Sequence, residues 1–146
     1  MSNELTVSHD RAKHFDSVHK VADATLSAPK GAVRPLDHAH LARYTLGDRS
    51  LELEILDLFL GETPRTLRRL EELALAAAVD AKAWHAACHT LKGSARAVGA
   101  FELGALAEAA EKEGELAPPR LQEHVHSLSA AVTRVADYIS VWRTAA

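Results

Sequence analysis

The residues of this sequence best suited to chemistry share one face of a predicted helix. His89 is followed one helical turn later by Lys92 and Gly93, and two turns later by Arg96. Residues three and four apart are neighbours on a helix surface, so these positions lie side by side. Imidazole is a workable nucleophile near neutral pH, because much of it is uncharged. Glycine on an exposed helix face costs roughly 1 kcal/mol against alanine, which indicates that something must come close beside the histidine.

The helix that carries these residues has clear start and stop signals. Asp80 is a good N-cap, and Gly99 is a residue type that commonly follows a helix end. Between them, apolar residues recur at spacings of three and four and form one stripe. The stripe comprises Trp84, Ala87, Cys88, Leu91, Ala95 and Val98. One side of the predicted helix 81–98 therefore builds a core, while a different face presents the histidine and the cations.

Two helices are predicted before this segment. A short one starts after the N-cap Asp37 and runs to Leu46. A long one follows the cap Asp48 and continues to about residue 78. Pro64 should kink this helix, or split it at 62–63, and we favour a kinked single helix. Its apolar stripe is predicted to comprise Leu51, Ile55, Leu58, Phe59, Leu70, Leu73 and Ala77.

Two more helices are predicted after the histidine segment. The first spans about 101–114. The second opens at Pro118, since proline belongs in the first turn of a helix, and its apolar residues alternate in steps of three and four. That seam comprises Leu121, Val125, Leu128, Val132, Val135, Ile139 and Trp142. Four apolar-striped helices with short connections predict an all-α fold, an antiparallel four-helix bundle with a short preceding helix.

Composition limits the class of protein. The chain has 146 residues, with 47% hydrophobic but only 5% aromatic residues, so the core must come from Leu, Ala, Val and Ile. The net charge of −3 argues against nucleic acid as a partner, and the single cysteine excludes an internal disulfide and a cysteine-based zinc site. The sequence has no apolar run long enough for a membrane span and no signal-peptide core, so we expect a soluble cytoplasmic protein.

The segment His89-Thr90-Leu91-Lys92-Gly93-Ser94, followed by Gly99-Ala100, resembles the active-site signature of histidine-containing phosphotransfer (HPt) domains. The resemblance extends from about Leu36 to the C-terminus and implies the same four-helix bundle. It implies that His89 accepts a phosphoryl group from an aspartate of a receiver domain and passes it to another response regulator. Lys92 would orient and neutralise that group, and Gly93 would let the receiver approach.

The resemblance also bears on cofactors and partners. It implies a phosphocarrier without kinase activity or a nucleotide site of its own, and the sequence contains no Gly-rich phosphate loop. No cofactor is expected, and magnesium, where needed, would belong to the receiver. The expected partners are response regulator receiver domains and a sensor or hybrid histidine kinase. We expect a free-standing protein that is a monomer, since the four stripes can satisfy one another within one chain.

The receiver is expected to contact exposed positions one turn to either side of the histidine. These are His85, Thr90, Gly93, Arg96 and Ala97, together with Lys92. A phosphoryl group carries about two negative charges, so Lys92 suits it as a mobile point charge. Arg96 could reach the phosphoryl oxygens or attract an acidic partner.

Each assignment has a plainer alternative. His89 and Lys92 could be ordinary surface residues, and Gly93 could serve close helix packing. His85 could be a bystander or form a metal pair with His89, but the carboxylate that would support zinc is missing from the intervening positions, so no metal site is expected. Two further functions stay open, namely a docking module that binds a receiver without carrying phosphate, and a metal-binding helical bundle.

Two other regions complete the prediction. Residues 1–34 are polar and are expected to form an N-terminal extension, mobile or partly helical, before a bundle domain over 35–146. Arg65, Arg68 and Arg69 form a basic cluster on the long helix. The plain interpretation of that cluster is a solvated face paired with Glu71 and Glu72.

Overall fold

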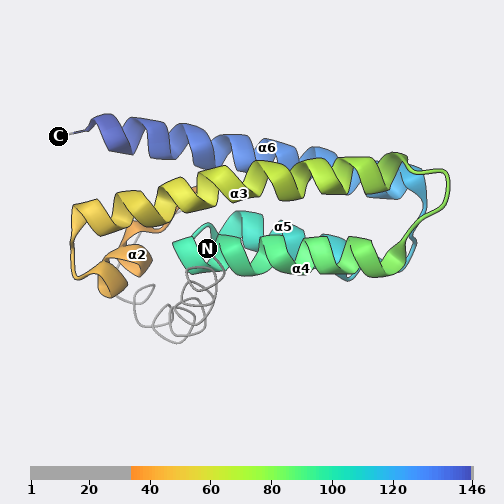
Figure 1. Ribbon diagram of the computed structural model, residues 1–146, viewed down its shortest axis with the longest axis horizontal. Helices are drawn as coiled ribbons and strands as arrows, with labels where there is room; N and C mark the ends of the chain where they lie inside the picture. The colour runs from red at the N-terminus through yellow and green to blue at the C-terminus, as the bar shows by residue number, and fades with distance from the viewer. Residues whose placement is uncertain (1–33, 146) are drawn as a thin grey trace.

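The computed structural model describes residues 34–145, and over this range the chain is all helical (Figure 1). The helices are α2 (His38–Thr45), α3 (Arg49–Leu75), α4 (Ala81–Val98), α5 (Phe101–Glu111) and α6 (Pro118–Thr144). The four longer helices run antiparallel in a ring, in which α3 packs on α4 and α6, and α5 packs on the same two. The short helix α2 lies against one end of α3 and α4. The predicted all-α bundle with a short preceding helix is therefore confirmed, whereas residues 1–33 of the predicted extension lie outside the described range.

The aspartates predicted to start three helices are N-caps in the structure. The Asp37 carboxylate accepts hydrogen bonds from the backbone N–H groups of Ala39 and His40, at 3.1 and 3.3 Å. The carboxylates of Asp48 and Asp80 each accept one from the residue three positions on, at 3.2 and 3.0 Å. Each bond satisfies a backbone donor that has no partner inside its own helix, so the helix starts follow directly from the sequence.

Helix α3 is a single helix of 27 residues that runs unbroken through Pro64. It ends at Leu75, a few residues before the predicted end, and its buried stripe differs from the prediction. Leu58 is 50% exposed, and Ala77 lies beyond the helix in an exposed position. The buried positions are Glu52, Leu56, Phe59, Thr63, Leu67, Leu70, Leu73 and Ala74. Of the predicted stripe, Phe59, Leu70 and Leu73 are buried and Ile55 packs against the core. Leucines occur on several sides of this helix, so periodicity alone does not settle which of them face the core.

The other core stripes follow the predicted pattern. In α4, Trp84 is fully buried, and its indole Nε1–H donates a 2.9 Å hydrogen bond to the carbonyl oxygen of Ala110 in α5. In α6, the buried members of the seam are Leu121, Leu128, Val135 and Ile139, while Val125, Val132 and Trp142 are partly buried against the core. No helix among residues 34–145 is both long enough and apolar enough to cross a bilayer.

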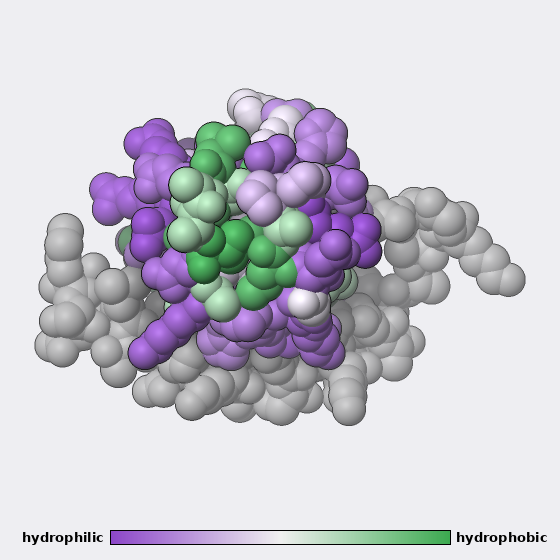
Figure 2. Space-filling view, turned by 90° about the vertical axis from the view of Figure 1, so that its right-hand side faces the viewer, coloured by the Kyte–Doolittle hydropathy of each residue, from purple (hydrophilic) through white to green (hydrophobic). Residues whose placement is uncertain are grey.

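The two ends of the bundle differ in character. At the α2 end, the Arg49 guanidinium lies 4.3 Å from the centre of the Trp142 ring and donates to the last carbonyl groups of α6. At the other end, where α3 passes to α4, apolar residues gather inside a hydrophilic rim (Figure 2). Leu75, the last residue of α3, is 73% exposed, and the exposed Ala77 and Ala78 lie in the connection that follows.

Gly99 follows the last residue of α4 along the chain, and its backbone contacts Asp37, the residue that caps the start of α2. Its φ is +88°, a left-handed conformation that side chains disfavour. Its carbonyl accepts a 2.9 Å hydrogen bond from the Asp37 N–H, and a Cβ at position 99 would lie 2.7 Å from the Asp37 carbonyl oxygen. Glycine is therefore required here both by backbone conformation and by close approach.

We predict that Gly99→Ala lowers the free energy of unfolding by about 2 kcal/mol, because alanine resists the left-handed conformation and collides with Asp37. Gly114→Ala is the matched control, since a Cβ there meets nothing within 4 Å, and its effect should stay within about 0.5 kcal/mol. Urea unfolding followed by circular dichroism measures both. Equal stability of the two variants would contradict the strain assigned to Gly99.

Candidate functional site

The central feature of the site is one carboxylate that bridges two side chains of α4. Glu111, the last residue of α5, accepts hydrogen bonds on both of its oxygens. His89 Nδ1 lies 2.8 Å from Oε2, and Lys92 Nζ lies 2.6 Å from Oε1. The His89 side chain is 68% exposed, whereas the side chains of Lys92 and Glu111 are only 16% and 20% exposed. The histidine thus stands in solvent above a largely covered ion pair.

This contact determines which ring nitrogen of His89 is available. The hydrogen bond from Lys92 lowers the pKa of Glu111; partial burial opposes that shift, and the hydrogen bond from His89 adds to it. An ionised carboxylate can only accept hydrogen bonds. The neutral imidazole must therefore donate through Nδ1–H, which leaves the lone pair on Nε2. The geometry can support a nucleophilic Nε2 and a cation held one helical turn away.

A second ion pair links the same helices about one turn further along. Arg96 Nη2 lies 3.2 Å from Glu108 Oε2, and Lys112 Nζ lies 3.3 Å from the other oxygen of that carboxylate. The Arg96 side chain also crosses Gly104, where an added Cβ would lie 3.1 Å from Arg96 Cγ. Arg96 is therefore held against α5 rather than extended beside His89.

The space next to His89 is open. A Cβ built at Gly93 meets no heavy atom within 4 Å. Gly99 and Gly104 differ, since a Cβ at either would meet an atom of the chain at 2.7 or 3.1 Å. Packing within this chain therefore does not require glycine at position 93.

The remaining predicted contact positions surround the same face. His85 and Thr90 are exposed, and Ala97 is half-buried. Residues 34–145 contain no group of three or more His, Cys, Asp or Glu that could hold a metal ion. Thr90 lies on the side of α4 that faces α3, where it lines a shallow open groove.

Cys88, the neighbour of the histidine, belongs to the core. It is fully buried, and burial together with the nearby Glu111 carboxylate raises the pKa of its thiol to about 12. The thiol stays protonated at neutral pH and is not a nucleophile. Cys88 therefore acts as a small core residue, as its place on the apolar stripe predicted.

The chain that follows Glu111 is anchored by a second carboxylate. Glu113 accepts hydrogen bonds from His124 Nε2 at 2.8 Å and from Arg120 Nε at 2.9 Å. The bond from His124, helped by the backbone N–H of Glu115 and by Arg120, lowers the pKa of Glu113 to about 2. This clamp ties the end of α5 to the first turns of α6 and so restrains the position of Glu111.

Glu111 is the functional residue that sequence reasoning missed. It lies 22 positions after His89, on a different helix. A signal was present, because Glu108 and Glu111 are three apart and directly follow the inward-facing Ala107 and Ala110. Two carboxylates beside the core stripe of α5 match two cations beside the core stripe of α4.

We predict that the neutral imidazole of His89 is predominantly the Nδ1–H tautomer, and that Glu111→Ala shifts the tautomer ratio about fivefold towards Nε2–H. A partly exposed charge-assisted hydrogen bond is worth roughly 1 kcal/mol, which corresponds to that factor. Two-bond ¹H–¹⁵N spectra of the ring distinguish the tautomers. Glu108→Ala is the control, since its carboxylate pairs with Arg96 and Lys112; an equal shift in both variants would contradict the role given to Glu111.

Comparison with known proteins now identifies the family. The family model described as the Hpt domain matches residues 54–138, more than half of the chain. The matched range includes the face of α4 described above and the whole of α5. The searches of curated proteins and of solved structures gave no match. The all-helical bundle and the family match agree, and the chain belongs to the Hpt domain family, whose members carry out phosphotransfer in phosphorelays.

Proposed function

We propose that this protein carries a phosphoryl group on Nε2 of His89, accepts it from the phosphorylated aspartate of a receiver domain, and passes it to another response regulator. The observation that carries the proposal is the exposed imidazole whose Nδ1 is held by Glu111 at 2.8 Å. A phosphoryl carrier must present its nucleophile to two different partners in turn. A side chain that is 68% exposed on a rigid helix suits that requirement.

The transfer step follows from the tautomer. The Nε2 lone pair attacks phosphorus while the bond between phosphorus and the aspartate oxygen breaks, and the aspartate leaves as a carboxylate. The imidazole keeps its Nδ1 proton and becomes cationic. That proton already points at the ionised Glu111, so the positive charge that develops on the ring is stabilised without rearrangement. The reverse step, towards the next regulator, releases the neutral ring.

Lys92 supplies the positive charge for the phosphoryl group. Its Nζ rests 2.6 Å from Glu111, one helical turn from His89. The flexible four-carbon stem lets the ammonium group move between Glu111 and the phosphoryl oxygens. Glu111 therefore holds both the ring and the cation in readiness, and acts as a positioning residue for each.

The docking face surrounds the histidine. Gly93 leaves room for the receiver to lie flat over α4, and His85, Thr90 and Ala97 border the same face, with Arg96 held on the α5 side. Receiver domains and a sensor or hybrid histidine kinase are the partners we propose, in the cytoplasm and with the protein acting as a monomer. The receiver would bring any metal ion that the reaction needs.

We predict that wild-type protein incubated with a phosphorylated receiver domain acquires a label that is stable in base and labile in acid, and that His89→Ala acquires none. Phosphate on a nitrogen and phosphate on a hydroxyl differ in this stability, so the assay identifies the site. His126→Ala is the control, because His126 is an exposed histidine on α6, which does not pack on α4. Label that survives in His89→Ala would refute the assignment. Receiver binding without label would indicate a docking module instead.

We also predict that Gly93→Gln slows phosphoryl transfer by at least tenfold while leaving the bundle folded. A Cβ at position 93 meets no heavy atom within 4 Å, so the fold has room for the start of the new side chain, and we expect that side chain to obstruct a partner. Ser127→Gln is the control, since Ser127 is exposed on α6, which packs on α3 and α5 and not on α4. Transfer rates from a phosphorylated receiver measure the difference. Unchanged transfer in Gly93→Gln would show that the receiver does not approach this position.

A further inference from the structure

A basic groove lies between α3 and α4, beside the proposed phosphoryl site. It is shallow and open, with a volume of about 430 Å³. Its lining residues are Arg65, Thr66, Arg69, Ala83, Ala86, Ala87 and Thr90. Two guanidinium groups from α3 thus face three alanines and a threonine from α4. Thr90 is the immediate neighbour of His89, so the groove reaches the edge of the docking face.

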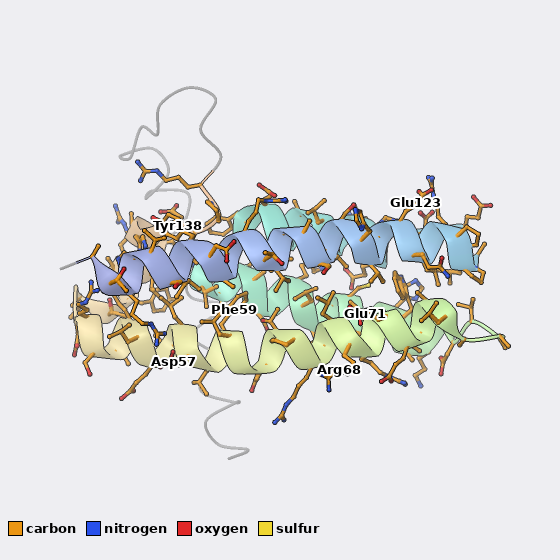
Figure 3. The ribbon with its side chains drawn as sticks, turned by 90° about the horizontal axis from the view of Figure 1, so that it is seen from above. Asp57, Phe59, Arg68, Glu71, Glu123 and Tyr138 are labelled. Carbon is orange, nitrogen blue, oxygen red and sulfur yellow. The ribbon has the colours of Figure 1, made fainter. Side chains whose placement is uncertain are left out.

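The charge on the α3 side of this groove is poorly neutralised within the protein. Arg69 is 4.0 Å from Glu72, and both side chains are more than half exposed, so that pair is weak. Within the described part of the chain, Arg65 and Arg68 have neither an ion pair nor a side-chain hydrogen bond. Glu71 extends towards α6, whereas Arg68 extends away from it (Figure 3). The predicted pairing of the cluster with its own glutamates therefore holds only for Arg69 and Glu72.

Arginines elsewhere in the bundle are matched by specific acceptors. Arg96, Arg120 and Arg134 each contact a glutamate of α5 or of the connection after it, and Arg143 contacts Asp57. The chain as a whole carries a net charge of −3. Arg65 has no carboxylate partner on one wall of this groove, and Arg69 beside it has only a weak one, so in an acidic protein the groove points to an acidic partner.

The shape of the groove indicates what kind of partner fits. Small-molecule sites are concave and cover most of their ligand, whereas this groove is open along its length. Alanines on the α4 side keep it wide enough for the side chains of another protein. A standard interface covers about 800 Å² on each partner, so a protein seated over His89 also covers the groove beside Thr90.

We propose that the receiver domain that exchanges phosphate with His89 places an acidic surface segment in this groove, with its carboxylates against Arg65 and Arg69. The inference rests on the proposed function and specifies the chemistry of the partner. The arginines lie beside the reacting atoms and do not touch them. They act on binding and on partner choice, and the transfer step within the docked complex does not depend on them.

The test compares two variants with the same change in charge. Arg65→Glu reverses a charge in the groove, and Arg68→Glu reverses one on the same helix outside it. The probe is the receiver domain that binds wild-type protein most tightly in a panel of purified receivers. We expect Arg65→Glu to raise the Kd for that receiver about tenfold in calorimetry at low salt, and Arg68→Glu to raise it less than twofold. The rate at saturating receiver should be unchanged, and added salt should reduce the difference between Arg65→Glu and wild type.

Rescue makes the test specific. Replacing one acidic residue of the receiver by lysine should restore binding to Arg65→Glu and weaken binding to wild-type protein. Equal Kd values for Arg65→Glu and Arg68→Glu would overturn the groove as the acidic contact, even if His89 is phosphorylated normally. Absence of label on His89 with the groove effect intact would instead refute the phosphocarrier and leave the docking surface. Receivers that do not bind wild-type protein at all would overturn both proposals.

Discussion

The ionised carboxylate of Glu111 is the contact on which the rest of the site depends. Without it, His89 and Lys92 would be two independent surface side chains on α4. With it, one nitrogen of the imidazole is engaged, the other is left to solvent, and the ammonium group is kept within a turn of the ring. The pair of hydrogen bonds also favours the ionised form of Glu111, since Lys92 lowers the pKa of its carboxyl group. A single acidic residue thus determines tautomer, orientation and local charge.

The fold restrains Glu111 from both sides along the chain. Just before it, the carbonyl of Ala110 accepts the indole hydrogen bond of Trp84, which fixes the end of α5 against α4. Just after it, Glu113 is clamped by His124 and Arg120 at the start of α6. The carboxylate therefore projects from backbone that is held in place at the level of the core and at the surface. Such support keeps a small exposed site in one geometry, as repeated binding by the proposed partners would require.

The sequence predicted the features that depend on residues close together along the chain. It did not predict the contacts between residues on different helices. The caps Asp37, Asp48 and Asp80 act on backbone groups two or three residues away, so their positions alone determined the helix starts. The seam of α3 was predicted only in part, with Phe59, Leu70 and Leu73 buried but Leu58 exposed, because leucines occur on several sides of that helix and its neighbours decide which ones are buried. Glu111 was missed for the same reason, since its partners lie on another helix and the relative rotation of α4 and α5 comes from packing.

Three departures from a stability-optimised surface lie on α3 and α4. Gly93 gives up roughly 1 kcal/mol of helix propensity although nothing in the chain needs the space. Arg65 stands in a groove without a carboxylate, and Leu58 of α3 is half exposed. On the opposite side, Arg134 and Arg143 of α6 are both paired with acidic residues. On the proposed function, successive partners bind this protein briefly, and each partner can stabilise only those polar and charged groups that the fold has left without a contact.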